Sequence, residues 1–222
     1  KIPELKKVCH AYGVSINEYL VAVYVWSVYT ECMHGMPSER PVRVAVPVNL
    51  RPYFNSITTK NFFVMVSAEF HPTKEIYTFE EVLKSVSESL RSQISRENLE
   101  KLFSYNVSNE KLLAARIVPL FLKNLAMRYV YTTSALANTA TVTNIGNISV
   151  SEEYRPYVEM FHAFLAMSKG QHLKGTICSY GDTLVFSFSY DLTDTSVQRG
   201  FFRKIAADGI AVEIETNGVN YE

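Results

Sequence analysis

Apolar residues recur along the chain with the spacing of buried helices. Ser15 and Glu18 have the spacing of a capping box, in which each side chain satisfies a backbone donor at a helix start. The turns that follow are apolar on nearly every side up to Gly35, which predicts a helix buried on several sides. A strand is the alternative, because the run is rich in β-branched residues. Residues 78–81 open a second helix with one apolar stripe: Phe79, Val82, Leu83, Val86, Leu90 and Ile94.

The middle of the chain is more polar. Residues 91–111 carry charges of both signs, and we expect them to form a solvated connection within one domain. Residues 110–131 have helical character. Pro119 lacks a backbone donor and should either start that helix or kink it.

Period-two patterns predict strands elsewhere. Residues 42–48 are a short apolar run, and residues 61–70 alternate with apolar side chains on both faces, which predicts a sheet covered on both sides. The aromatic run before Gly170, residues 172–180 and residues 183–190 are expected to form an antiparallel meander with a two-residue turn at 181–182.

The end of the chain has one more helix and one more strand in this interpretation. Residues 193–208 are predicted to be helical, because Gly209 is a typical residue to stop a helix. Residues 210–216 alternate and are predicted to be a final strand. Asp191 and Asp194 flank the helix start, where capping explains them.

This order of elements predicts the α/β class, a two-layer sandwich with a mixed, largely antiparallel sheet covered by helices. No linker or low-complexity stretch divides residues 1–222, so a single domain is expected. The chain begins at Lys1, and Leu5, Val8 and Tyr12 already have helical spacing. We therefore expect the start to be a boundary within a longer protein.

Composition excludes several classes of function. The 22 basic residues balance the 22 acidic ones, and no local basic patch marks a nucleic-acid site. Cys9, Cys32 and Cys178 lack the spacing of a disulfide framework or a zinc site, which favours a reducing, cytoplasmic setting. The apolar run at residues 19–28 is shorter than the roughly 20 residues that a bilayer requires, and no signal peptide precedes it. We expect no membrane span and no metal site.

Two polar motifs follow predicted strands. In Asn49-Leu50-Arg51-Pro52, the arginine can pair with a carboxylate or contact a substrate phosphate, and pairing that fixes a loop is favoured. In Thr143-Asn144-Ile145-Gly146-Asn147, a hydroxyl, an amide and exposed backbone donors can meet a ligand. A plain turn is an equal alternative, because Asn and Gly tolerate unusual backbone angles.

Together with Asn61-Phe62-Phe63 and residues 209–217, these motifs resemble the second half of a two-lobed CoA-dependent acyltransferase. The superfamily includes chloramphenicol acetyltransferase, condensation domains and bacterial alcohol acetyltransferases, and the resemblance is closest to the last two. Its His-His-x-x-x-Asp-Gly motif lies in the first lobe. None of the five histidines here has that context: His10, His34, His71, His162 and His172. His162 is interpreted as a satisfied strand residue.

The resemblance implies that the chain holds no catalytic residue and is inactive alone. It implies that Thr143, Asn144 and Gly146 lie beside the substrate tunnel, and that Asn49 and Arg51 are structural. Acyl-CoA or acyl-pantetheine would be a co-substrate rather than a bound cofactor, and an alcohol or amine the acceptor. The partner would be the chain's own first lobe, whose absence predicts self-association as a symmetric dimer. The alternative is a non-catalytic module that binds a partner protein or an apolar ligand.

Overall fold

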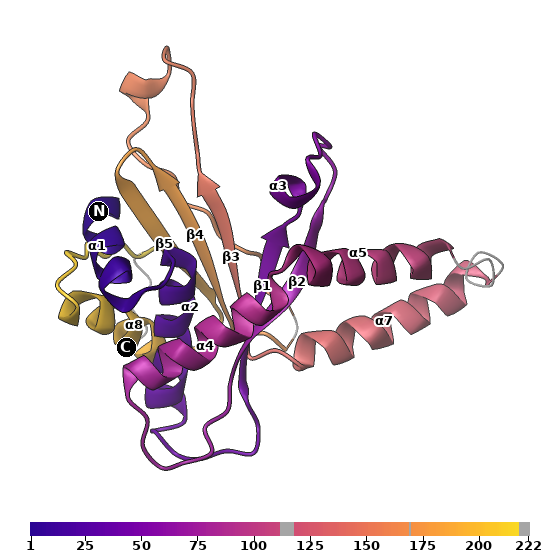
Figure 1. The fold of residues 1–222 in the computed structure, drawn as a ribbon, viewed down its shortest axis with the longest axis horizontal. Helices are drawn as coiled ribbons and strands as arrows, with labels where there is room; N and C mark the ends of the chain where they lie inside the picture. The colour runs from indigo at the N-terminus through magenta and orange to yellow at the C-terminus, as the bar shows by residue number, and fades with distance from the viewer. Residues whose placement is uncertain (112–117, 169, 218–222) are drawn as a thin grey trace.

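The computed structural model describes residues 1–111, 118–168 and 170–217. One sheet has the strand order β2-β1-β3-β4-β5 (Figure 1). The outer pairs β1–β2 and β4–β5 are antiparallel, and the inner pairs β1–β3 and β3–β4 are parallel. The expected α/β class with a mixed sheet is confirmed. The strands are β1 (Val42–Asn49), β2 (Phe63–Phe70), β3 (Ala140–Asn147), β4 (Leu173–Tyr180) and β5 (Thr183–Tyr190).

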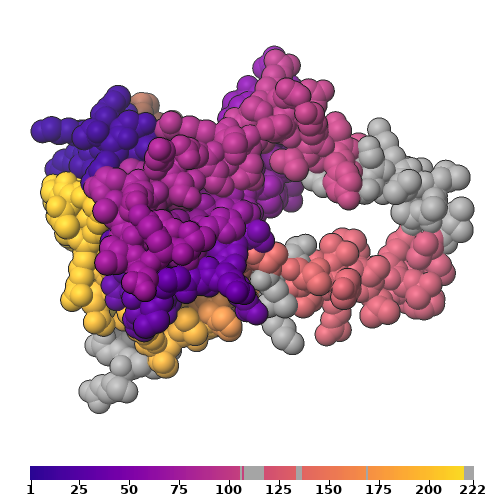
Figure 2. All heavy atoms as spheres, turned by 60° about the horizontal axis from the view of Figure 1, so that its bottom comes forward, coloured from indigo at the N-terminus to yellow at the C-terminus, as the bar shows by residue number. Residues whose placement is uncertain are grey.

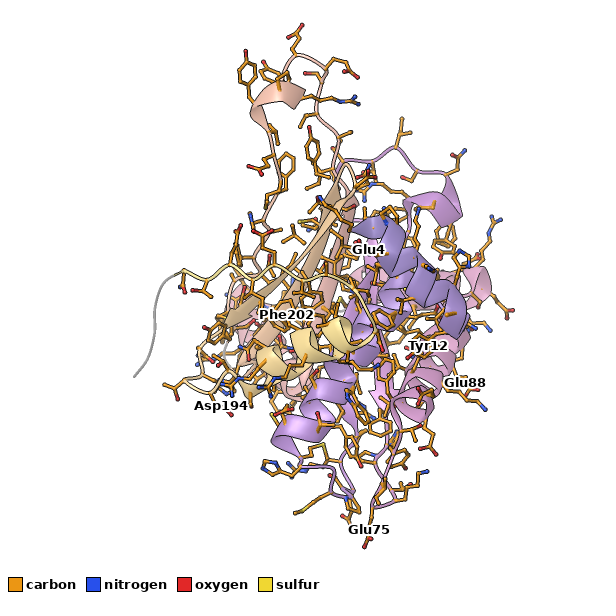
Figure 3. All side chains as sticks on the ribbon, turned by 90° about the vertical axis from the view of Figure 1, so that its left-hand side faces the viewer. Glu4, Tyr12, Glu75, Glu88, Asp194 and Phe202 are labelled. Atoms are coloured by element: carbon orange, nitrogen blue, oxygen red, sulfur yellow. The ribbon has the colours of Figure 1, made fainter. Side chains whose placement is uncertain are left out.

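Helices lie on one face of this sheet, which we call the helical face (Figures 1 and 3). They are α1 (Ile2–Tyr12), α2 (Ile16–Ser27), α4 (Phe79–Gln93) and α8 (Ser196–Ala207). A π-helix, η1 (Val28–Cys32), continues α2, and the short helices α3 (Arg51–Phe54) and η2 (Arg155–Tyr157) lie in connections. Two further helices, α5 (Arg96–Lys111) and α7 (Leu120–Leu136), project beyond β2 (Figure 1).

Helix α2 is the centre of the core. Residues 19–25 are all buried, and the helix packs against α4, α8 and the sheet. The expected capping box is present, with the Ser15 hydroxyl accepting from Glu18 N and the Glu18 carboxylate accepting from Ser15 N. Because every side of α2 contacts another element, its sequence has no room for a polar face.

The interpretation of residues 91–111 as a solvated connection is wrong. Helix α5 occupies most of this range, and Leu99 is fully buried with Leu50 and Val64 beneath the ends of β1 and β2. Phe103, one turn further on, packs on the same cluster. Tertiary contacts therefore stabilise a helix in a segment whose polar pattern favours a loop.

Pro119 starts a helix rather than kinking one. Helix α7 begins at Leu120, and the Pro119 carbonyl accepts from the backbone N–H groups of Leu122 and Lys123. A proline at this position gives up no hydrogen bond, because the first N–H groups of a helix have no partner within it. Part of the predicted helix at 110–131 lies outside the described residues.

Three strand predictions differ from the structure. The aromatic run before Gly170 is not a strand, so only the β4–β5 hairpin of the expected meander forms. Residues 210–217 are also irregular, because only Ile210 and Val212 reach the core while Ile214 is exposed. In β2, Phe63 and Met65 are 47% and 46% exposed, so the described chain covers only one side of that strand.

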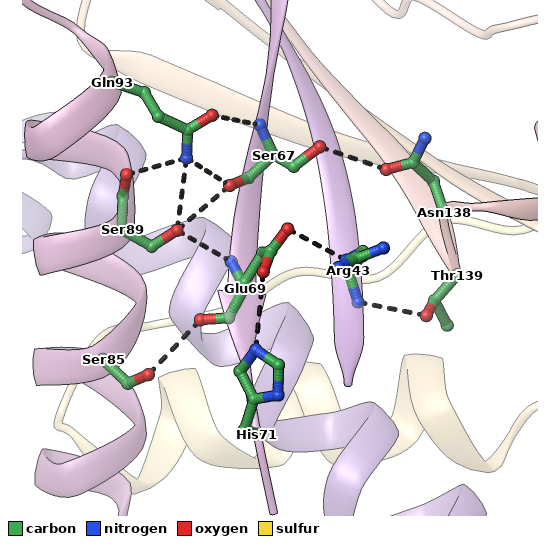
Figure 4. Close-up of polar contacts among 9 residues, drawn as sticks. All are labelled: Arg43, Ser67, Glu69, His71, Ser85, Ser89, Gln93, Asn138 and Thr139. Atoms are coloured by element: carbon green, nitrogen blue, oxygen red, sulfur yellow. Dashed lines mark hydrogen bonds and ion pairs between the residues drawn. The ribbon is translucent and has the colours of Figure 1, made fainter. Parts of the chain in front are cut away.

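Side chains of α4 cover the outer edge of β2 (Figure 4). Gln93 accepts from Ser67 N at 3.1 Å and donates to Ser67 O at 2.7 Å, while Ser89 accepts from Glu69 N at 3.1 Å. Ser85 donates to Glu69 O at 3.3 Å. These contacts satisfy the backbone groups that a sixth strand would otherwise bind, which protects an edge prone to aggregation.

We predict that Gln93→Ala lowers the free energy of unfolding by about 1–3 kcal/mol, because Ser67 N loses its side-chain partner and Ser67 O keeps only the Ser89 hydroxyl. Urea unfolding measures the change. Ser92→Ala is the matched control on the same helix, since its hydroxyl contacts only the Ser89 carbonyl. Equal stability of the Gln93 and Ser92 variants would contradict the role of the amide.

A pH-dependent contribution is expected from Glu18. Burial raises the pKa of this carboxyl, but hydrogen bonds from Arg91 and Ser15 outweigh burial and lower the pKa below its ordinary value. The stabilisation is therefore complete above the unfolded-state pKa of about 4.3 and is lost as the pH falls through the folded-state value. The native chain should have a higher free energy of unfolding than the Glu18→Gln variant near neutral pH, and the two values should converge in acid. Glu88→Gln, an exposed change on α4, should show no such convergence.

Candidate functional site

The second face of the sheet, opposite the helical face, is polar along its centre. Side chains alternate along a strand, so Val142 and Ile177 enter the core while their neighbours point to the second face. The register aligns two rows of these neighbours across β3, β4 and β5. The rows are Thr141, Lys174 and Ser189, followed by Thr143, Thr176 and Ser187.

Residues 158–168 cover the β4 part of this face. The Cys178 thiol lies 3.1 Å from the Phe161 carbonyl, and the Phe161 ring contacts Tyr180 at 5.4 Å between centroids. Lys174 donates to the carbonyl of Ala166 at 2.7 Å and to the Ser168 hydroxyl. This segment buries most of the β4 side chains on the second face.

Thr143 lies beyond this cover. Thr176, its neighbour on β4, is 3% exposed, whereas Thr143 is half-buried. Among the described residues, no hydrogen-bond partner meets the Thr143 hydroxyl, so the group can donate to a ligand or accept from one.

Asn144 and Gly146 build a β-bulge. The Asn144 side-chain oxygen accepts from Gly146 N at 2.8 Å, and the register with β4 shifts between these two residues. Gly146 has φ +86°, a left-handed conformation that a side chain would strain. The structure thus gives Asn144 a local backbone role, and the bulge shifts the β3–β4 register just after Thr143 before pairing resumes at Gly146 and Asn147.

The two polar motifs lie at the same end of the sheet. Because β1 and β3 are parallel neighbours, their carboxyl ends point the same way, at the top of Figure 1. Asn49 ends β1, Arg51 follows it, and Thr143, Asn144 and Gly146 lie at the end of β3. Sequence separation of about ninety residues hides this juxtaposition.

Arg51 binds backbone rather than a carboxylate. Its guanidinium donates to the carbonyls of Thr58 at 2.8 Å and Lys60 at 2.6 Å, and to the Asn49 side-chain oxygen at 3.2 Å. The same Asn49 oxygen accepts from Arg51 N at 3.1 Å. The expected carboxylate is not among the described partners, so the correction is that carbonyl groups take its place in tethering residues 49–60.

His162 and His172 each have an acidic partner. His162 lies in irregular structure, not in the expected strand, and its Nε2 is 3.5 Å from the Glu215 carboxylate. Asp191 was interpreted as a helix cap, but it pairs with His172 Nδ1 at 3.0 Å. Asp194 does accept from Ser196 N at 2.9 Å at the start of α8.

Sequence reasoning missed the His172–Asp191 pair, although a signal was present. The two-residue turn fixes the register of the β4–β5 hairpin, with Leu173 opposite Tyr190, and the next pair outward is 172 with 191. Within the described ranges, no cluster of three acidic, histidine or cysteine side chains could hold a metal ion. Nor does any helix described there have the length and apolar content to cross a membrane.

No family model matches the sequence, and no curated protein does. Solved structures share the fold. The wax ester synthase/diacylglycerol acyltransferase from Marinobacter aquaeolei VT8 is 14% identical with a TM-score of 0.50, over 94% of this chain and 47% of that one. The nonribosomal peptide synthetase FmoA3 is 17% identical with a TM-score of 0.60, over 93% and 20%.

The epimerization domain from the third module of tyrocidine synthetase B is 12% identical with a TM-score of 0.54, over 94% of this chain and 46% of that one. The chain spans less than half the length of each of these three proteins. It has the expected chloramphenicol-acetyltransferase-like fold and corresponds to one part of each matched protein.

We predict that Arg51→Ala lowers the free energy of unfolding by about 1–3 kcal/mol, because the loop carbonyls lose charged donors. Arg51→Lys should recover only part of the loss, since an ammonium cannot reproduce the planar fork. Thermal unfolding of both variants, with exposed Arg40→Ala as control, measures the effect. An Arg51→Ala protein as stable as the control would show that the tether is not needed.

Proposed function

We propose that the chain is the C-terminal lobe of a two-lobed acyltransferase that moves an acyl group from CoA or carrier-bound pantetheine to an alcohol or amine. The observation that carries the proposal is the sheet with two unlike faces, whose second face presents the Thr143 hydroxyl, unpartnered among the described residues, at the end of the sheet where both polar motifs lie. The shared fold with a wax ester synthase/diacylglycerol acyltransferase supports the reaction class.

In this proposal the second face walls the substrate tunnel. A histidine of the other lobe removes the proton of the acceptor, while this lobe positions the thioester and donates a hydrogen bond to the developing oxyanion. Thr143 is the proposed donor, because its register with Thr176 places its hydroxyl on the second face, while Asn144 and Gly146 form the bulge beside it. Arg51 and Asn49 hold the neighbouring loop and make no direct contribution to the chemistry.

Complementation tests this function. The purified chain alone should release no CoA from acetyl-CoA in the presence of an acceptor, because a general base contributes about 10²- to 10⁴-fold and lies in the other lobe. Adding a lobe that carries His-His-x-x-x-Asp-Gly should produce turnover. Turnover by the chain alone would favour a different mechanism. Binding of the two lobes without turnover would favour the non-catalytic module.

We predict that Thr143→Val in the complemented enzyme lowers kcat by about 10²-fold, the usual loss for one oxyanion donor. KM should change little, since the hydrogen bond strengthens only in the transition state. Thr132→Val on α7 is the matched control, because that hydroxyl contacts only a carbonyl of its own helix. Unchanged kcat for Thr143→Val would remove the residue from the reaction.

A further inference from the structure

Lys174 is a buried charged side chain that forms no ion pair with a carboxylate in the described part of the chain. It is 7% exposed, and its ammonium group donates to the Ala166 carbonyl at 2.7 Å and to the Ser168 hydroxyl. Both acceptors are neutral. Taking an ammonium group out of water is costly, and neutral oxygens offset that cost less well than a carboxylate does. Stability alone therefore does not account for a lysine at this position.

The lysine stands on a rigid base. Strand β4 is paired on both sides, with Lys174 opposite Thr141 on β3 and opposite Ser189 on β5. Its side chain leaves the second face of the sheet and meets residues 166–168. These residues end the stretch 158–168, which we call the covering segment.

The covering segment has little backbone support. Residues 159–167 are in neither helix nor strand, and among the described residues no backbone–backbone hydrogen bond involves them. Side chains of β4 hold the segment at two points. The Cys178 thiol and the Tyr180 ring contact Phe161, and Lys174 binds the other end. A thiol is a weak donor, whereas hydrogen bonds from an ammonium group are roughly twice as strong as those between neutral groups.

The covering segment ends beside Thr143. Thr143 and Thr176 are register neighbours on β3 and β4. Thr176 is 3% exposed beneath the segment, while Thr143 is half-buried. The position of the segment therefore decides how much room, and how much water, the Thr143 hydroxyl has around it.

We propose that Lys174 is a positioning residue, which holds residues 166–168 against β4 and so fixes the wall beside Thr143. This inference rests on the acyl-transfer function proposed above. With the wall in place, water is kept from the thioester, and the acyl group passes to the alcohol or amine. With the wall lifted, water takes the acyl group instead, and the products are a free thiol and a carboxylic acid.

Thiol labelling of the chain alone tests the attachment. Cys178 lies under the covering segment, and burial raises the pKa of its thiol, so it should react slowly. Cys9 is buried in the core, where burial raises the pKa of its thiol to about 11, and it reports unfolding of the whole chain. Cys32→Ser removes the exposed thiol. In that background, Lys174→Met should raise the labelling rate of Cys178 at least about 10-fold and leave that of Cys9 unchanged.

Two further variants serve as controls for the labelling. Lys174→Arg keeps a cationic donor, so its Cys178 labelling rate should lie closer to the native rate than that of Lys174→Met. Arg128→Met is the matched control, because it removes an exposed cation from α7, which projects from the body of the chain (Figure 2). Unchanged labelling of Cys178 in Lys174→Met, or an equal rise at Cys9, overturns the proposed attachment.

The ratio of acyl transfer to hydrolysis in the complemented enzyme tests the consequence for the reaction. Lys174→Met should lower this ratio at least about 5-fold, because water reaches the thioester. A lysine that only stabilises the fold would lower both rates together, so an unchanged ratio overturns the positioning role. Failure of the native lobes to turn over would count against the proposed function alone, since the labelling does not depend on turnover.

Discussion

The burial of α2 on all sides is the constraint on which the rest of the structure depends. A helix without a polar face is stable in water only if several elements surround it at once. The sheet, α4 and α8 supply those sides, and α1 closes the end near Tyr12, which stacks on Tyr19 (Figure 3). The sheet, α4 and α8, which come from distant parts of the sequence, are thus held together by one apolar helix.

This arrangement commits the sheet to having two unlike faces. All the helices that pack on α2 lie on one side, and in the described part of the chain the centre of the other side carries the polar rows of β3, β4 and β5, with residues 158–168 over β4. A covered sheet would need apolar residues there. Threonine has a high β-propensity and serine is small, and neither requires burial. Their hydroxyls remain available to a ligand or to another lobe.

Elements with strong local patterns were predictable from the sequence. The capping boxes at Ser15 and Thr78 fix the starts of α2 and α4 through bonds between residues three apart, which sequence shows directly. The hairpin at Gly181 is local as well. Helix α5 was missed because its stability comes from Leu99 beneath β1 and β2, a contact that depends on tertiary structure.

The site divides in the same way. The residue types of the two polar motifs marked them as candidates, but only the parallel pairing of β1 with β3 brings Arg51 and Thr143 to one edge. Parallel pairs are joined by long crossovers, here residues 50–139, so no local pattern reports their alignment. The bulge is a middle case: Asn144 and Gly146 predicted a special backbone, and the structure shows the Asn144 side-chain oxygen accepting from Gly146 N. Among the described residues the Thr143 hydroxyl has no hydrogen-bond partner, and the pairing of Thr143 with Thr176 holds its backbone just before the bulge. A rigid backbone beside a hydroxyl that no described residue engages suits the proposed oxyanion donor, since a donor that must first reorient gives little advantage in the transition state.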